Sequence, residues 1–243
     1  MSSPYGLEIV ECCECCPRRE ELSFCDLTGE ALRAFDELKS PALYPKGALF
    51  FLEGQPPRGV FVLCAGRVKL WSTSGDGHVI ITHIARPVEI LGLCATLTGE
   101  PHAVTAETTE ACQVNFVGRE DFLSFLASHP DACFRAAQQL SRNYRAALGK
   151  VRLLGLSYSA ASKFARFLLE SSGPAAGAGG EAQCGPDSLR LTLTHEEIGQ
   201  AIGASRETVT RLVGEFKRGK LIEVRGATLL LSDRHSLERL AEY

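Results

Sequence analysis

The stretch Thr194–Lys217, THEEIGQAIGASRETVTRLVGEFK, has the pattern of two short helices joined by a tight turn. Thr194 can cap the first helix, and Glu197 stands at the position that completes a capping box. Gly203 supplies the turn, and Ser205 can cap the second helix. The sequence therefore predicts a helix-turn-helix, and the rest of the chain is organised around it.

The second helix of this pair has two faces of opposite character. Its apolar residues recur at helical spacing and are expected to face the core: Val209, Leu212, Val213 and Phe216. Polar residues collect on the other side: Arg206, Glu207, Thr210 and Arg211. Guanidinium, carboxylate and hydroxyl groups on one helix face can bond to base edges in the major groove of double-stranded DNA. An ordinary helical hairpin with a solvated charged face is the alternative.

The residues after this helix favour the DNA-binding interpretation. Leu221–Arg225 and Ala227–Ser232 flank Gly226 in a hairpin pattern, which would complete a winged helix. Between Gly203 and Arg225 there are six Lys and Arg residues against three Glu, although the whole chain carries a net charge of −3. A locally positive surface on an acidic protein suits a regulator that binds particular DNA sites rather than all DNA.

Composition indicates a globular, cytoplasmic protein. Of the 243 residues, 45% are hydrophobic and 23% are charged, which are ordinary values for a globular chain. No apolar stretch is long enough to cross a membrane and the N-terminus lacks the features of a signal peptide, so we expect a cytoplasmic location without membrane contacts. Ten cysteines are many for such a chain and indicate metal, cluster or redox chemistry.

The hydrophobic pattern divides the chain into four parts of an α+β protein. Residues 1–29 carry five of the ten cysteines. Short strands split by turns predict an antiparallel β-roll within residues 30–129. A long dimerisation helix follows at 130–156, and a winged helix-turn-helix domain at 157–243. In the long helix, apolar residues repeat at spacings of three and four, which favours a parallel helix pair over a helix packed on its own domain: Ala137, Leu140, Tyr144, Ala147, Val151 and Leu154.

Several motifs in a fixed order carry a resemblance to a known family. They are FLEG at 51–54, GVFVLCAGRVKL at 59–70, SGDG at 74–77, LTHEEIG at 193–199 and SRETVTRL at 205–212. From about residue 24 to 240 the chain resembles the CRP/FNR family of transcription regulators. The resemblance implies a cyclic-nucleotide-binding-type roll, a homodimer through residues 130–156, RNA polymerase as a partner and a two-fold symmetric operator. It also implies base-reading roles for Arg206, Glu207 and Arg211.

The roll lacks groups that a cyclic nucleotide would need. Family members that bind a nucleotide carry Gly-Glu before a short helix and Arg-Ser/Thr-Ala after it. Here Glu89 is present, but Val88 stands in place of the glycine and Val104 in place of the arginine. A valine cannot neutralise a phosphate, so we do not expect a cyclic nucleotide to be the signal.

The N-terminal cysteines favour a different sensor. Cys13-x-x-Cys16 and Cys25 supply three soft thiolates on one segment, and an iron–sulfur cluster needs four ligands. The stretch ETTEACQVNF at 107–116 resembles the segment that completes the set in cluster-bearing members, which implies Cys112 as the fourth ligand. The resemblance thus implies a [4Fe–4S] cluster that senses oxygen, nitric oxide or redox state.

Other uses of the cysteines stay open. Cys12 and Cys15 have the same spacing as Cys13 and Cys16, which we prefer because Cys16 precedes a proline, a common context for cluster ligands. A structural zinc ion needs the same four ligands, and a thiol–disulfide switch needs only two of them. Three of the remaining cysteines lie in apolar patterns and are expected to be buried and inert: Cys64, Cys94 and Cys133. Cys184 lies in the flexible stretch 173–185 and is expected to have no role.

We do not expect an enzyme. No nucleophile–base pairing stands out, and His195-Glu196-Glu197 lacks the second histidine of a zinc-protease motif. A small redox protein built on the cysteines is the alternative of a different class, but it leaves the charged helix face unexplained. The sequence therefore predicts a DNA-binding regulator controlled through its cysteines.

Overall fold

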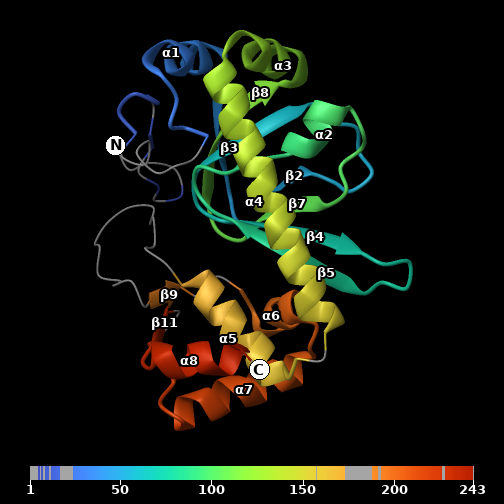
Figure 1. Ribbon diagram of the computed structural model, residues 1–243, viewed down its shortest axis with the longest axis vertical. Coiled ribbons are helices and arrows are strands. Elements are labelled where there is room, and N and C mark those ends of the chain that lie inside the picture. Colours follow the sequence, from blue (N-terminus) through green and yellow to red (C-terminus); the bar gives the residue numbers. More distant parts are fainter. Residues whose placement is uncertain are drawn as a thin grey trace. The chain divides into compact units, whose positions relative to one another are not determined.

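The computed structural model describes residues 5, 7, 9–10, 12–16, 24–156, 158–172, 188–190, 193–225 and 228–242 of the chain. It divides into two compact units, Met1–Ser72 with His83–Ala146 and Thr73–Thr82 with Ala147–Tyr243 (Figure 1). Each unit is described below by itself.

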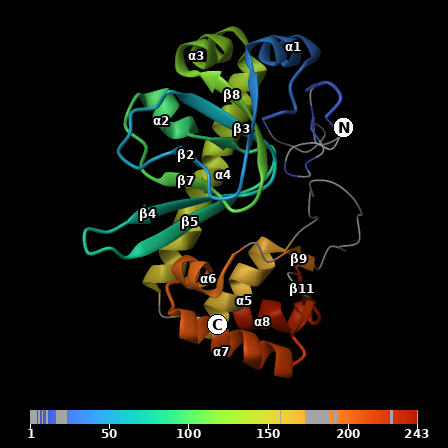
Figure 2. The same cartoon turned by 180° about the vertical axis from the view of Figure 1, so that it is seen from behind.

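Two four-stranded sheets form the roll of the N-terminal unit (Figure 1, Figure 2). The first has the order β1 (Ser40–Tyr44), β8 (Cys112–Gly118), β3 (Gly59–Ala65) and β6 (Ile90–Leu91). The second has the order β2 (Leu49–Phe51), β7 (Thr105–Thr108), β4 (Val68–Thr73) and β5 (Val79–Ala85). Strand β8 pairs antiparallel with both β1 and β3, so it lies inside its sheet.

The strands β3 and β8 send alternate side chains into two different cores. Leu63 and Val114 lie opposite each other and belong to the core inside the roll. Val60 and Val117 also lie opposite each other, but they belong to a second core on the outer face of the sheet. Successive strand residues point to opposite faces, so the pairing register fixes which residues reach each core.

Helices cover the outer face of the first sheet. They are α1 (Gly29–Leu38), α3 (Arg119–Ser128) and the beginning of α4 (Pro130–Gly155), while α2 (Leu93–Thr98) follows β6. Their contact is aromatic: Phe24 packs edge-on against Phe35 with ring centroids 5.5 Å apart, and it lies 5.9 Å from Phe122. Phe24 is fully buried, so it fixes the chain just before α1 on this core.

Helix α4 begins at Pro130, as the sequence predicts, and changes character along its length. Ala132 and Ala136 are buried in the outer core. Every residue from 141 to 149 is exposed. The exposed positions include large apolar side chains: Phe134, Tyr144, Leu148 and Val151. Leu140 and Leu154, two of the apolar residues predicted to line the helix pair, are half-buried by other residues of the same chain.

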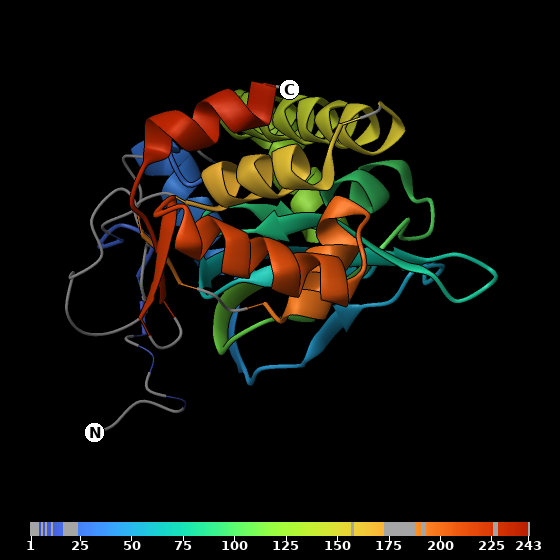
Figure 3. The same ribbon diagram turned by 90° about the horizontal axis from the view of Figure 1, so that it is seen from below.

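The C-terminal unit packs its helices on a three-stranded sheet with the order β10 (Ile222–Arg225), β11 (Thr228–Leu231) and β9 (Ser188–Arg190). Its helices are α5 (Ala160–Ser171), α6 (His195–Ile202), α7 (Arg206–Arg218) and α8 (Arg234–Glu242). Figure 3 shows α5 between α8 and α7. Together these elements form a winged helix-turn-helix, which confirms the predicted fold.

Three elements differ from the sequence prediction. Glu89–Leu93 has the apolar pattern of one of the short strands expected in the roll, but only the two-residue β6 forms there, because the chain turns at Gly92 (φ 78°) into α2. Strand β1 and helix α8 have no counterpart in the prediction. The stretch 173–185, expected to be a flexible loop, lies outside the described residues. None of the helices in the described part of the chain has the length and apolar character needed to cross a membrane.

Candidate functional site

Local hydrogen bonds and one close backbone contact build the helix-turn-helix. Both halves of the predicted capping box are present: Glu197 N donates to Thr194 Oγ1 at 3.2 Å, and Thr194 N donates to Glu197 Oε2 at 2.8 Å. Gly203 takes the left-handed conformation (φ 67°) and ends α6. The sequence prediction did not use Gly199, where an added Cβ would lie 2.5 Å from Ala204 O. Only glycine permits so tight a turn.

Helix α7 presents the predicted polar face to solvent. Ser205 accepts a hydrogen bond from Thr208 N at 3.2 Å and so caps the helix. The residues of the inner face are buried, apart from the half-buried Val213: Val209, Leu212 and Phe216. Phe216 packs against Phe164 of α5 with ring centroids 5.1 Å apart. The four predicted DNA-contact residues are all exposed on the opposite face: Arg206, Glu207, Thr210 and Arg211.

Charge pairs order this exposed face. Arg211 Nη1 lies 2.7 Å from Glu215 Oε1, one turn further along α7. Hydrogen bonds from its own backbone N–H and from Ser205 hold the pKa of Glu207 below its ordinary value, so the carboxylate stays charged. Thr210 Oγ1 lies 2.9 Å from His195 Nδ1 and so links α7 to α6. The face therefore offers charged donors and acceptors on a rigid helix, as base-edge recognition requires.

The hairpin of β10 and β11, the wing of the fold, adds further charges near α7. Strands β10 and β11 pair from Ile222–Leu231 to Arg225–Thr228. Arg225 Nε lies 2.9 Å from Glu223 Oε1 on β10. Gly226, expected as the hairpin turn, and Ala227, expected to begin the second strand, lie outside the described residues.

The end of α4 contacts the helix-turn-helix inside the C-terminal unit. Lys150 Nζ donates a hydrogen bond to the carbonyl of Ala201, near the end of α6. Burial lowers the pKa of Lys150, and the nearby Glu170 carboxylate opposes this effect. Leu154 packs against the turn, where its Cδ2 atom would lie 2.8 Å from a Cβ at Gly203. The last turns of α4 are thus joined to the element that carries α7.

The roll holds Glu89 in internal contacts. Glu89 Oε2 lies 2.7 Å from His83 Nε2, and Glu89 Oε1 accepts a hydrogen bond from Arg86 N at 3.0 Å. Val88 has φ 70°, the left-handed backbone that favours glycine, so the turn survives without the glycine. Val104 packs against the inner core. An apolar side chain at that position provides no charge for a phosphate.

Cys13 lies against the outer face of the first sheet. Its backbone N–H donates to Asp36 Oδ1 at 3.0 Å, and its thiol accepts from Lys39 Nζ at 3.4 Å. Asn115 Nδ2 lies 3.8 Å from the same sulfur. Burial raises the pKa of Cys13 to about 12, with a hydrogen bond to Asp36 adding to the effect and Lys39 opposing it.

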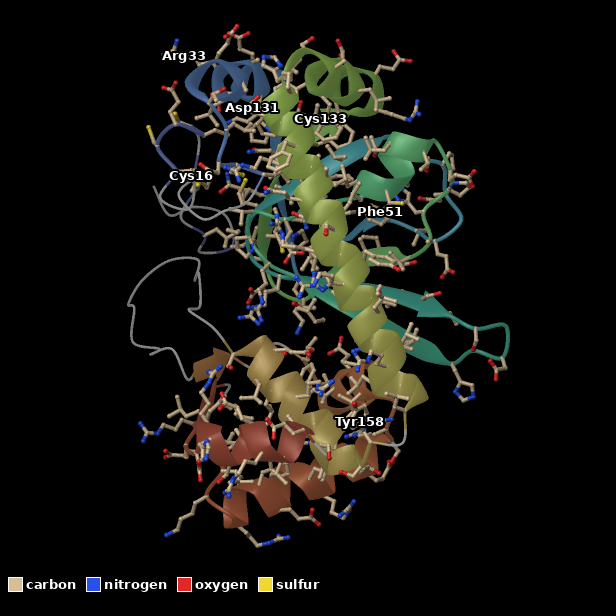
Figure 4. The ribbon with its side chains drawn as sticks, viewed as in Figure 1. Cys16, Arg33, Phe51, Asp131, Cys133 and Tyr158 are labelled. Carbon is tan, nitrogen blue, oxygen red and sulfur yellow. The ribbon has the colours of Figure 1, made fainter. Side chains whose placement is uncertain are left out.

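Cys16 and Cys25 lie near Cys13. Cys16 N donates to Cys13 O at 3.3 Å, which closes a turn in the segment before α1 (Figure 4). Cys25 packs against the outer core next to Phe24. Burial raises the pKa of Cys25, and charge on the neighbouring Cys64, Cys13 and Cys16 sulfurs raises it further. The structure therefore brings three of the four predicted metal ligands together.

The alternative pair, Cys12 and Cys15, does not pack on the outer core. The thiols of Cys12 and Cys15 are hydrogen-bonded to each other, which lowers the pKa of Cys12 and raises that of Cys15. Cys15 is exposed, and neither residue contacts the outer core. Of the two registers, Cys13 with Cys16 is the one that faces Cys25.

Cys112 lies on the other face of the sheet. It is fully buried in the inner core, where its sulfur donates to Glu110 O at 3.3 Å and lies 3.4 Å from Arg67 O. Burial raises its pKa to about 12. The structure does not bring Cys112 together with Cys13, Cys16 and Cys25.

Of the cysteines expected to be buried and inert, two are exposed, and the third lies near Cys25. Cys94 and Cys133 are exposed rather than buried, because each lies on the outward side of its helix (Figure 4 labels Cys133). Cys64 is half-buried and belongs to the surroundings of Cys25, although the sequence pattern suggested an inert core thiol. Cys184 lies outside the described residues.

The thiols are neighbours without being a preformed single-ion site. Among the residues that the structure describes, no three histidine, cysteine, aspartate or glutamate side chains are grouped so that they could hold a metal ion. A zinc ion requires its sulfurs at about 2.3 Å. In a four-iron cluster each thiolate binds a different iron atom, so the ligands are spread more widely. The soft donor set suits either an iron–sulfur cluster or a zinc ion.

Comparison with known proteins agrees with this architecture. Residues 42–129 match the family model of the cyclic nucleotide-binding domain, and residues 162–240 match that of the Crp-like helix-turn-helix domain. The chain is 30% identical over 219 residues to the transcriptional activator protein anr of Pseudomonas aeruginosa, covering 88% of this chain and 86% of that protein. It is 27% identical over 213 residues to the CRP-like cAMP-activated global transcriptional regulator of Mycobacterium tuberculosis, covering 87% and 92%.

A solved structure has the same fold. FixK2 from Bradyrhizobium japonicum superposes with a TM-score of 0.72 at 22% identity, covering 83% of this chain and 96% of that one. A sensor roll followed by a winged reading head defines a DNA-binding transcription regulator. The chain belongs to the CRP/FNR family, as the sequence motifs predicted.

Proposed function

We propose that this regulator reads a two-fold symmetric operator as a homodimer and responds to oxygen, nitric oxide or redox state through a cysteine-held [4Fe–4S] cluster. The observation that carries the sensing proposal is the gathering of Cys13, Cys16 and Cys25 beside Lys39 on the outer face of the roll. The Lys39 ammonium stabilises negative charge on thiolate sulfur. Four soft thiolates are the ligand set of such clusters.

Base recognition falls to the exposed face of α7. Arg206 and Arg211 have the forked geometry that binds guanine, and Glu207 can accept from cytosine. Thr210 is held by His195 and suits a phosphate or base contact. The operator should therefore carry guanines in each half-site. Selection of bound duplexes from a random pool tests this: recovery of sequences without two-fold symmetry contradicts the proposal.

A second copy of the chain is proposed to cover the exposed apolar residues of α4. Phe134, Tyr144 and Val151 are 61%, 65% and 66% exposed, far more than is usual for such side chains. A parallel pair through residues 130–156 would bury them and would place two reading helices on one DNA duplex. Sedimentation of Tyr144→Glu should show a monomer where the parent chain is a dimer. RNA polymerase remains the partner expected from the family.

The N-terminal segment has direct contacts through which a signal can reach α4. Arg135 is paired with the Asp26 carboxylate, one residue after Cys25. Asp131 Oδ2 accepts from Thr28 N at 3.0 Å and from Thr28 Oγ1 at 2.8 Å. A change in the position of Cys25 therefore moves residues that hold the first turns of α4.

Loss of the cluster should loosen these contacts. When bound, the cluster supplies a reaction with oxygen or nitric oxide that ends in its degradation. The protein then loses the bonds that tie Cys13, Cys16 and Cys25 together. A shift of a few kcal/mol between two arrangements of α4 is enough to change the fraction of dimers competent for DNA binding.

The experiment is anaerobic purification followed by iron, sulfide and zinc analysis and an absorption spectrum. We expect about four irons and four sulfides per chain and a brown colour that is lost in air. Colourless protein with one zinc per chain supports a structural zinc site instead and contradicts the sensing proposal. Metal-free protein whose DNA affinity follows the thiol–disulfide ratio contradicts it in favour of a thiol switch.

A further inference from the structure

The pairing register of β8 separates Cys112 from the other cysteines of the sensor. Gln113 and Asn115 point to the outer face, where Gln113 Nε2 donates to Val10 O at 2.6 Å and Asn115 contacts Cys13. Cys112 and Val114 alternate with them and point into the inner core. Cys112 is the first residue of β8, and it would have to leave the inner core and turn to the outer face of the sheet to reach Cys13.

Cys64 is on the face where the N-terminal segment lies. Val62 lies opposite Asn115, and Leu63 opposite Val114. The next pair is Ala65 with Gln113, so the register shifts between Leu63 and Ala65 and leaves Cys64 as the extra residue of a β-bulge. In a bulge two residues oppose one on the partner strand. Cys64 and Ala65 therefore stand opposite Gln113, the residue that bonds to Val10.

Cys13 and Cys25 pack against the outer core, to which Val62 of β3 also belongs. Cys64 follows Val62 by two residues and so lies on the same side of the first sheet. Cys112 packs in the inner core instead.

Asn115 provides a separate indication that a group is bound here. Its side chain is only 3% exposed. Its Nδ2 atom contacts Cys13, but within the described part of the chain its Oδ1 atom has no hydrogen-bond partner. A buried amide oxygen without a partner is unfavourable, because it has lost its hydrogen bonds to water. Such an amide beside ligand sulfurs is well placed to bond to a cluster or to a water next to it.

We propose that Cys64, rather than Cys112, is the fourth thiolate of the site formed by Cys13, Cys16 and Cys25. The inference rests on the proposed cluster function and names one of its ligands. It leaves Cys112 in its place in the inner core.

The test compares Cys64→Ser and Cys112→Ser in the full chain, purified without oxygen. We expect Cys64→Ser to lose at least half of its iron and sulfide and to show an altered electron paramagnetic resonance spectrum after reduction. Cys112→Ser should keep both near parental levels. Cys94→Ser is the matched control, because Cys94 is exposed on α2. Cluster loss in Cys112→Ser with retention in Cys64→Ser overturns the inference and leaves the cluster function standing.

A second measurement does not depend on any variant folding. The parent chain is alkylated with iodoacetamide before and after air exposure, and each cysteine is quantified by mass spectrometry. Cys64 should become at least fivefold more reactive when the cluster is lost, together with Cys13 and Cys16, while Cys112 stays unreactive until the chain is unfolded. Equal reactivity of Cys64 in both states overturns the inference. Parent protein without iron or sulfide contradicts the cluster function itself.

Discussion

The reading head and the cysteine-bearing segment are held in place by different kinds of contact. In the helix-turn-helix, the capping box, the Ser205 cap and the Gly199 turn join residues three to five positions apart. The N-terminal segment is held by contacts such as Val10–Gln113, which lie 103 residues apart in the chain. The helix-turn-helix is therefore built locally, whereas the N-terminal segment depends on the finished roll. The contacts of the segment can therefore change while the helix-turn-helix keeps its own.

Phe24→Ala should have the largest effect, because Phe24 anchors the segment to the outer core. Truncating a fully buried phenylalanine costs about 3–5 kcal/mol of unfolding free energy. Calorimetry should show the transition of the N-terminal unit at a lower temperature, and the iron content should fall. Leu49→Ala, at a half-exposed site on β2, is the control and should change little. An unchanged iron content in Phe24→Ala would show that the segment is held by other contacts.

Gly199→Ala should disturb the reading head while leaving the sensor intact. The added methyl group meets the Ala204 carbonyl, which cannot move without opening the turn, and overpacking of this kind costs about 1–3 kcal/mol. DNA affinity should fall, while iron content stays at the parental level. In Gly214→Ala the new methyl group lies 3.6 Å from the flexible Arg218 side chain, so α7 should be stabilised. An equal loss of DNA affinity in Gly199→Ala and Gly214→Ala would contradict the proposed role of the turn.

Arg206→Ala tests recognition apart from folding. It should cost about 1–3 kcal/mol of discrimination at one base position of each half-site, without changing the unfolding free energy. Fluorescence anisotropy titrations on the selected operator and on its single-base variants measure this. Arg239→Ala removes the same charge from α8 and should leave base preference unchanged. If the ratio of affinities for operator and scrambled DNA is unchanged in Arg206→Ala, the assignment of this residue is wrong.

Glu215→Gln should have the smallest effect, and it should raise operator affinity where the other variants lower affinity or stability. Its pair with Arg211 is exposed, and such pairs are worth about 0.2–1 kcal/mol. Removing it releases the guanidinium and one negative charge, so operator affinity should rise up to about fivefold. The control is Glu238→Gln, whose carboxylate pairs with Arg234 at the same spacing on α8. Weaker binding by Glu215→Gln would mean that Glu215 positions Arg211 for its base.

The same difference in contact range decides what could be predicted from the sequence. Thr194, Glu197, Gly203 and Ser205 signal their structure within a few residues, so the reading head was predicted almost completely. Helical spacing also predicted that Arg206, Glu207, Thr210 and Arg211 share one exposed face of α7, as the structure shows, while their base-reading roles stay a prediction. Gly199 was missed because its closeness to the Ala204 carbonyl depends on the backbone path of the turn.

The arrangement of the cysteines could not be predicted in this way. Spacing identified Cys13, Cys16 and Cys25 as a set, but which face Cys112 takes depends on the register of β8 between β1 and β3. The position of Cys64 depends on a β-bulge, and the residue types of β3 do not indicate that a bulge forms there. The pattern that suggested buried thiols at Cys94 and Cys133 failed because both residues lie on helices with only one covered side.

Helix α4 contributes residues to both units and is held by side-chain contacts in each of them. Helix α4 runs unbroken for 26 residues, which at about 1.5 Å per residue makes a rod of about 39 Å. Its first turns are held by Asp26 and Thr28, and its last turns hold Ala201 and the turn at Gly203. One continuous helix therefore has side-chain contacts with the segment that carries Cys25 near its start and with the helix-turn-helix near its end.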